Sequence, residues 1–142
     1  MIEFELTLRV DRPLDEVFGI WADPGRIPTW QGSAESVQVQ GEPGPGCSWS
    51  VVRRTLGTRQ TMTARYTAFE PGRRLVEEGI AGPAKSRAET LFEASGAGTS
   101  VRTRVSVELG GALGRLGARV AKGSIIKQAR EDQQRLKALI EG

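Results

Sequence analysis

The chain has 142 residues, which favours one domain over 1–142 with a core large enough to fold without a metal or disulfide. Its 20 basic and 17 acidic side chains leave a net charge of +3, far less than a nucleic-acid-binding tail carries. Histidine is absent and Cys47 is the one cysteine, which excludes His-based triads, zinc sites built on His or several Cys, and internal disulfides. We therefore expect neither a metal nor a cofactor.

The first residues and the apolar runs of the chain indicate where in the cell the protein is expected. The first ten residues, MIEFELTLRV, are acidic and alternate between polar and apolar, unlike a secretory signal. No apolar run approaches the roughly 20 residues needed to span a bilayer. A cytoplasmic protein is expected.

The amino-terminal part of the chain predicts a strand followed by two helical segments. Residues 3–10 alternate between apolar and polar, which is typical of a half-buried strand. Within 11–23 the apolar residues recur with helical spacing, at Leu14, Val17, Phe18 and Trp21. Asp23 and Pro24 suit the start of a second, shorter helical turn, which Pro28 is expected to end.

From about residue 34 to residue 109 the pattern is repeatedly strand and turn. Strands are predicted around Val37 and Val39 and over 47–56, 59–69, 73–80, 86–94 and 99–109. The dipeptide GT at 57–58 resembles a type II′ hairpin link, and EPGR at 70–73 suits a type II turn. Short turns between consecutive strands predict an antiparallel meander. Helices lie only at the two ends of the sequence, so the fold class is α+β.

The last predicted element is a long helix over 112–140. Its apolar stripe changes face near Gly123 and Ser124, and a Gly-Ser pair is a recognised place for a kink. A bend or break is therefore predicted near 122–124. The residues predicted to be buried are Leu14, Phe18 and Trp21 of the first helix and Leu136 and Ile140 of the last helix.

Five stretches resemble the START-like (SRPBCC) superfamily, in its polyketide cyclase/dehydrase and lipid-transport branch. They are RPLDEVFGIWADPGRIPTW, PGPGCSWSV, FEPGRRL, GAGTSVRTRVSVEL and DQQRLKALIEG. The resemblance implies a helix-grip fold, in which a curved antiparallel sheet of about seven strands wraps around the C-terminal helix, with two short helices after strand 1. It also implies a cavity between sheet and helix that holds lipids, polyketides or similar molecules. Fold by itself does not choose among these ligands.

Strand phase then suggests that Trp49, Arg53, Tyr66, Glu78 and Phe92 line such a cavity, and the resemblance implies that Trp30, in the turn after the first helix, lies at its rim. Trp30 either closes one end of the cavity or fills the core beneath its loop, and the two roles can coexist. Arg53 either points inward and holds a carboxylate or enolate oxygen, or keeps its head in water.

For the other candidate site residues, too, the sequence allows two placements of the side chain. The hydroxyl of Tyr66 is either a donor inside the cavity or bonded to backbone in a packed core. Glu78 faces inward if Val76 and Ile80 do, whereas the competing phase puts Leu75 and Glu77 inside. Cys47 has no histidine to activate it, so a catalytic thiolate is not expected.

Three functions compete. Binding of a small apolar ligand leads, because an enzyme of the cyclase or dehydratase type would depend on Glu77 or Glu78, Tyr66 and Arg53 alone. The third is a membrane- or partner-binding module, since basic residues of the last helix could briefly contact anionic lipid headgroups. Nucleic acid is not expected, and the protein is expected to be a monomer or homodimer. If a cavity exists, 110–121 is predicted to act as a flap over its mouth.

Overall fold

A seven-stranded antiparallel sheet forms most of the molecule, in the order β1-β7-β6-β5-β4-β3-β2. The computed structural model describes residues 1–55, 57–110 and 117–142. Its strands are β1 (Ile2–Val10), β2 (Ala34–Gln40), β3 (Ser48–Thr55), β4 (Thr58–Glu70), β5 (Arg74–Ala81), β6 (Ala84–Ser95) and β7 (Gly98–Glu108). Its helices are α1 (Leu14–Trp21), η1 (Pro24–Arg26), α2 (Ile27–Trp30) and α4 (Ala118–Glu141).

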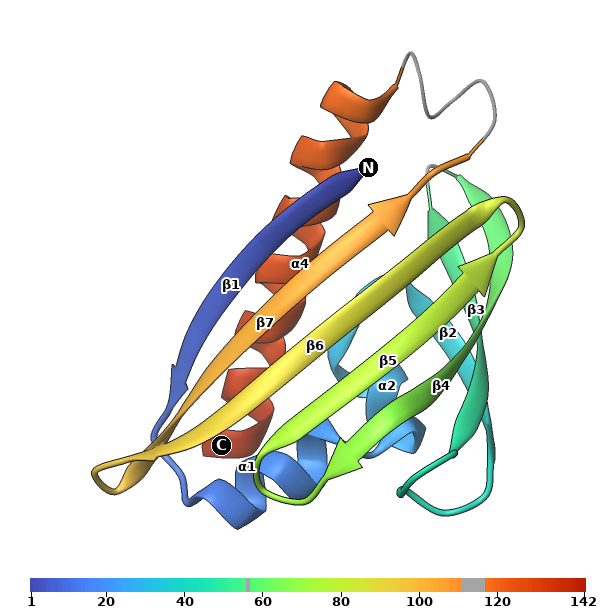
Figure 1. Cartoon of the computed structure of the whole chain (residues 1–142). Coiled ribbons are helices and arrows are strands. Elements are labelled where there is room, and N and C mark those ends of the chain that lie inside the picture. Colours follow the sequence, from blue (N-terminus) through green and yellow to red (C-terminus); the bar gives the residue numbers. More distant parts are fainter. Residues whose placement is uncertain (56, 111–116) are drawn as a thin grey trace.

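The long helix α4 lies along one face of the curved sheet, and α1 covers one end of the space between them (Figure 1). Every neighbouring pair of strands is antiparallel, and most pairs are consecutive in the chain and joined by short turns. The predicted α+β meander with a C-terminal helix is confirmed.

The turns show how far local sequence determined the connections. In EPGR, the backbone N–H of Arg73 donates to the Glu70 carbonyl over 3.0 Å, and Gly72 has a φ of +73°. Both features are those of the predicted type II turn. The link between β3 and β4 differs by one residue, because Thr55 pairs with Thr58. Gly57 is then the second residue of the link, not the first as a type II′ turn requires.

Pro28 begins a helix instead of ending one. Asp23 accepts a hydrogen bond from the Gly25 N–H at 3.0 Å and starts η1, as its sequence predicts. Pro28 is the second residue of α2. A proline is tolerated there because the first N–H groups of a helix have no partner within the helix. The predicted stop at Pro28 is therefore wrong.

Helix α4 runs without interruption through Gly123 and Ser124, so a break near 122–124 is wrong, while the alternative, a bend there, stays a prediction (Figure 1). One glycine costs a helix only about 1 kcal/mol relative to alanine, less than the packing of the rest of α4 contributes. Helical residues begin at Ala118 in the described part. Residues 111–116 of the predicted helix and flap lie outside the described residues.

The core is densest where α1 meets the sheet and the carboxyl half of α4. Phe18, Trp21, Leu136 and Ile140 are buried as predicted, whereas Leu14 is only half-buried. The rings of Phe18 and Trp21 pack edge-on against Phe92, with centroids 5.0 and 5.6 Å away.

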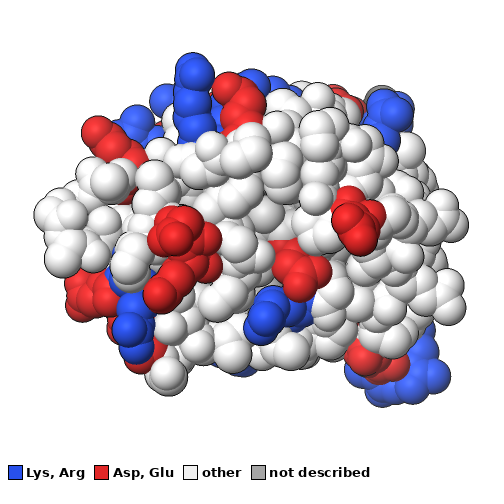
Figure 2. Space-filling model, turned by 90° about the horizontal axis from the view of Figure 1, so that it is seen from below, with Lys and Arg blue, Asp and Glu red and all other residues white. Residues whose placement is uncertain are grey.

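The end of α4 is fastened to the connection between β1 and α1. The Asp11 N–H donates to the Glu141 carboxylate at 2.8 Å, and Lys137 donates to the same oxygen at 2.7 Å. Seen from this end, side chains of both signs are scattered over a largely uncharged surface (Figure 2). None of the described helices combines the length and apolar character needed to cross a membrane.

Candidate functional site

The register between β4, β5 and β6 decides which side chains face α4. Tyr66 lies opposite Glu77, and Glu77 lies opposite Ala88. Tyr66 is buried, so this cross-strand row faces the interior. Glu78 belongs to the neighbouring row and is exposed.

Glu78 is therefore not an interior residue, and the competing phase, with Leu75 and Glu77 inside, is correct. Alternation could not choose between the phases, because each places one glutamate and at least one apolar side chain inward. The irregularity between Tyr66 and Ala68 also lets Val76 be buried, at 2% exposed, although it does not share the phase of Leu75.

A small space, here called the inner cavity, lies between α1, α2 and the sheet. It measures about 40 Å³, and its lining includes Trp21, Trp30, Gln31, Trp49, Tyr66, Glu77, Ala88 and Thr90. Such a volume admits a group about the size of a water molecule or two, and not a whole lipid. The lining of the inner cavity combines aromatic and polar side chains.

Glu77 supplies the carboxyl group of the inner cavity. Within the described part of the chain, no hydrogen bond or ion pair reaches its side chain. Burial raises the pKa of Glu77, and the nearby charge of Arg53 opposes that rise only in part. A carboxyl group in such a setting keeps its proton to a higher pH than an exposed glutamate does.

Arg53 points away from bulk water, toward the loop between α2 and β2. Its guanidinium donates to the Gln31 side chain and, at 3.1 Å, to the Ser33 hydroxyl. Burial lowers the pKa of Arg53, against the attraction of Glu77 and Asp132. The inward orientation, left open by the sequence, is thus the one the structure has, with the guanidinium held in place by two partners.

Asp132 on α4 is a polar residue that sequence reasoning missed. It is buried, and one carboxylate oxygen accepts from the Gly32 N–H at 3.0 Å, Gln128 at 2.8 Å and Arg135 at 3.0 Å. The bond from Gly32 joins α4 to the same loop that holds Arg53, whereas the other two bonds lie within α4. Its spacing four residues before Leu136 was a signal that Asp132 shares the buried stripe.

Tyr66 contributes its ring to the inner cavity, while its hydroxyl is already bonded. The hydroxyl donates to the Ala22 carbonyl at 2.9 Å, and the ring lies 4.8 Å from Trp49, centroid to centroid. Burial, and secondarily the charge of Glu77, raises the pKa of Tyr66. The packed, backbone-bonded alternative is the one that the structure has.

The two roles considered for Trp30 coexist. Its ring is 9% exposed, packs 6.3 Å from Trp21 and lines the inner cavity. Its indole Nε1–H is buried and has no hydrogen-bond partner. Phe92, by contrast, is packed between Phe18 and Trp21 and is not part of the cavity lining, so its expected place in the site is corrected.

Cys47 is buried beside this region, and burial raises the pKa of its thiol. The sulfur is therefore kept protonated and is poorly suited to act as a nucleophile. In the described ranges, no group of three or more Cys, Asp or Glu side chains is placed to hold a metal ion.

Several interior positions beyond Glu77, toward the amino end of α4, are only half-buried, although Ile2 on β1 is buried. They include Phe4, Ala88 and Val105 on the sheet and Ile125 and Ala129 on the helix. These side chains therefore keep part of their apolar surface accessible.

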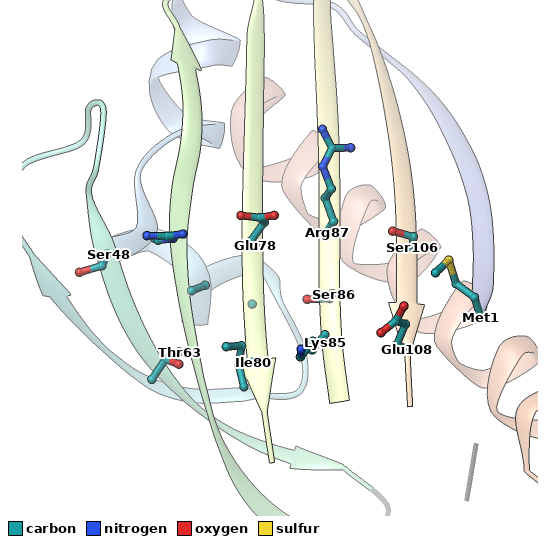
Figure 3. A pocket seen from close by; sticks show the side chains of 13 residues that line it. Met1, Ser48, Thr63, Glu78, Ile80, Lys85, Ser86, Arg87, Ser106 and Glu108 are labelled. Carbon is teal, nitrogen blue, oxygen red and sulfur yellow. The ribbon is translucent and has the colours of Figure 1, made fainter. Parts of the chain in front are cut away.

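A larger depression, here called the outer groove, lies on the opposite face of the sheet. It measures about 550 Å³ and is lined by, among others, Arg65, Glu78, Lys85 and Arg87 (Figure 3). In Figure 3, Glu78 and Arg87 project from neighbouring strands while α4 lies behind the sheet. The inner cavity is lined by Glu77, whose pKa is raised by burial, and by Trp30, whose buried indole N–H has no partner among the described residues, so it is the candidate site despite its smaller volume.

Known structures share this architecture. TTHA0849 from Thermus thermophilus superposes with a TM-score of 0.85 at 16% identity, covering 97% of this chain and 96% of its own. A START superfamily protein from Mycobacterium smegmatis gives 0.84 at 10% identity, over 99% and 98% of the two chains. The Zhui aromatase/cyclase from Streptomyces sp. R1128 gives 0.80 at 15% identity, over 98% and 93%. At such identities the likeness establishes the helix-grip fold alone.

No curated protein matches the sequence. The family described as "Polyketide cyclase / dehydrase and lipid transport" matches residues 1–141, almost the entire chain. The chain therefore belongs to the polyketide cyclase/dehydrase and lipid-transport family of START-like proteins.

Proposed function

We propose that this protein binds a small, largely apolar molecule between α4 and the sheet, with the molecule's polar end at the inner cavity. The observation that carries the proposal is the Glu77 carboxyl group, which lines a cavity rich in aromatic side chains and receives no hydrogen bond from any described residue. The buried indole N–H of Trp30, in the lining of the same cavity, also has no partner among the described residues, and a buried polar group left unpaired costs about 1–3 kcal/mol. Such groups concentrate at functional sites, where a ligand provides the missing partner.

The surroundings of Glu77 suit an apolar ligand body. Phe4, Val105 and Ile125 are half-buried along the direction from the inner cavity toward the amino end of α4. A ligand lying there would cover these side chains, and each Å² of apolar surface removed from water contributes about 25 cal/mol. The family and the structural relatives are consistent with ligands of this kind.

A blocking substitution with a matched control tests the proposal. Ala88→Phe places a ring at the lining of the inner cavity, whereas Arg87→Phe places the same ring on the exposed face of the same strand. The neutral fluorescent probe N-phenyl-1-naphthylamine is titrated into the parent and both variants. Circular dichroism confirms that each variant is folded.

We expect the parent and Arg87→Phe to bind the probe with similar affinity and Ala88→Phe to bind it at least tenfold more weakly. Equal binding by all three would place the probe outside the interior and overturn the proposal. Native mass spectrometry of the purified parent would, in addition, give the mass of any ligand that copurifies.

A cyclase or dehydratase activity in the same space is the second candidate, because an inward carboxyl group lies near an inward guanidinium. The raised pKa of Glu77 suits general acid–base catalysis, and Arg53 could hold the oxygen of an enolate. No direct ion pair joins the two among the described residues, so their charges are not already neutralised by each other.

A linear 3,5-dioxo thioester serves as a polyketide mimic for this second test. Enzymatic cyclisation should appear in the mass spectrum as loss of water or thiol, and Glu77→Gln should abolish it while leaving probe binding measurable. Turnover that is unaffected by Glu77→Gln would exclude Glu77 as the acid or base.

A further inference from the structure

Two residues that line the inner cavity, Trp30 and Glu77, carry polar groups with no hydrogen-bond partner among residues 1–55, 57–110 and 117–142. The indole Nε1–H of Trp30 is buried and bonded to nothing, and it can only donate. The carboxyl group of Glu77 lines the same cavity without a hydrogen bond from any described residue. The hydroxyl of Tyr66 does not supply the missing bond, because it already donates to the Ala22 carbonyl.

This pair restricts the chemistry of a group that can occupy the cavity. An ammonium group would offer nothing to the Trp30 donor, because it has no acceptor. A carboxylate would bring a second negative charge or a second buried acid beside Glu77. A ketone oxygen could accept from Trp30 and from a protonated Glu77, but it has no hydrogen to give to the carboxylate form of Glu77, whereas a hydroxyl group can serve either form.

A hydroxyl group meets both requirements, because its oxygen accepts while its hydrogen donates. Its size also matches a cavity of about 40 Å³. Resting on the ligand binding proposed above, we infer that the ligand carries a neutral hydroxyl group, a phenol or an alcohol, that accepts from Trp30 Nε1–H and donates to Glu77. The apolar body of the ligand then lies over the half-buried positions that lead away from the cavity.

Three naphthalenes of similar size separate this inference from apolar binding in general. 2-Naphthol can accept and donate, 2-methoxynaphthalene can only accept, and 2-methylnaphthalene can do neither. Their dissociation constants are measured by calorimetry at pH 7, where 2-naphthol is neutral. We expect 2-naphthol to bind at least tenfold more tightly than 2-methylnaphthalene, with the methoxy compound between them.

Two substitutions assign the effect to the two side chains. Glu77→Leu should reduce the preference for 2-naphthol over the methoxy compound to less than about twofold, whereas Glu78→Leu, on the exposed face of the same strand, should leave it intact. Trp30→Phe removes the indole donor and should reduce the preference for the methoxy over the methyl compound. If Trp30→Phe does not fold, Glu77→Leu and its control still decide the matter.

The outcomes separate the two proposals. Equal binding of all three naphthalenes by the parent overturns the hydroxyl inference and leaves apolar ligand binding standing. A preference for 2-naphthol that survives Glu77→Leu overturns the assigned role of Glu77. Failure of all three compounds and of N-phenyl-1-naphthylamine to bind overturns both proposals.

Discussion

The space between α4 and the sheet is packed differently at its two ends. At the end covered by α1, the side chains of Phe18, Phe92 and Leu136 are buried in one hydrophobic core, in which the rings of Phe18 and Phe92 pack against each other. At the other end, Phe4 and Ile125 are only half-buried. Glu77 and the inner cavity lie between the two regions. One sheet thus supplies both a stable core and an accessible site, and local openings are expected mainly at the less buried end.

Removing an aromatic side chain from each end tests this difference most strongly. Phe18→Ala should lower the free energy of unfolding by about 3–5 kcal/mol, because it leaves a hole in a close-packed core. Phe4→Ala should cost only about 1–2 kcal/mol, because less of its apolar surface is buried. Urea denaturation measures both, and equal losses would show that the two ends are packed alike.

The pH dependence of stability tests the carboxyl group between the two ends. The pKa of Glu77 is raised in the folded protein, so as pH rises above about 4.3 the unfolded chain loses this proton first, and the folded state becomes less stable. Each unit of the raised pKa corresponds to about 1.4 kcal/mol.

Glu77→Gln should therefore be more stable than the parent at pH 7 and equally stable near pH 4. Urea denaturation across this range measures the difference, with Glu78→Gln as the control on the exposed face of β5. A Glu77→Gln protein whose stability advantage is the same at both pH values would contradict the inward placement of Glu77.

The amino half of α4 can be strengthened without touching the core. A Cβ added at Gly123 meets no atom within 4 Å, and the residue is already helical. Gly123→Ala should stabilise the protein by up to about 1 kcal/mol through helix propensity.

Hydrogen exchange locates this effect. Amides near residue 123 should become more protected in Gly123→Ala, while those near Leu136 change little. A uniform change along α4 would mean that the helix opens as one unit and that its two halves do not differ in local stability.

The smallest effect is expected at the carboxyl end of α4. The pKa of Glu141 is lowered, chiefly by the hydrogen bond from the Asp11 N–H and by Lys137. Its contribution to stability is thus present above about pH 4.3 and lost as pH falls through the lowered folded value. Glu141→Gln should be slightly less stable than the parent at pH 7 and indistinguishable in strong acid, the reverse of Glu77→Gln. The same stability deficit at both pH values would refute this linkage.

Local sequence determined those parts of the fold that depend on neighbours in the chain. Apolar spacing identified Phe18 and Trp21 as the buried face of α1, and the glycine at position 72 identified a type II turn. The antiparallel meander followed from strands separated by short turns, because such links leave few other arrangements. These predictions agree with the structure because helix and turn geometry depend on residues that are close together in the sequence.

The candidate site was decided by tertiary structure. Alternation could not tell Glu77 from Glu78, because both phases of β5 carry apolar residues, and only pairing with β4 and β6 selects one. Asp132 and Arg53 become interior groups because the loop between α2 and β2 provides their partners from far away in the chain. Helix α4 stays continuous through Gly123 because a modest local preference for a kink is outweighed by the rest of the helix. Burial and pairing between distant segments are properties of the assembled fold, so no short stretch of sequence contains them.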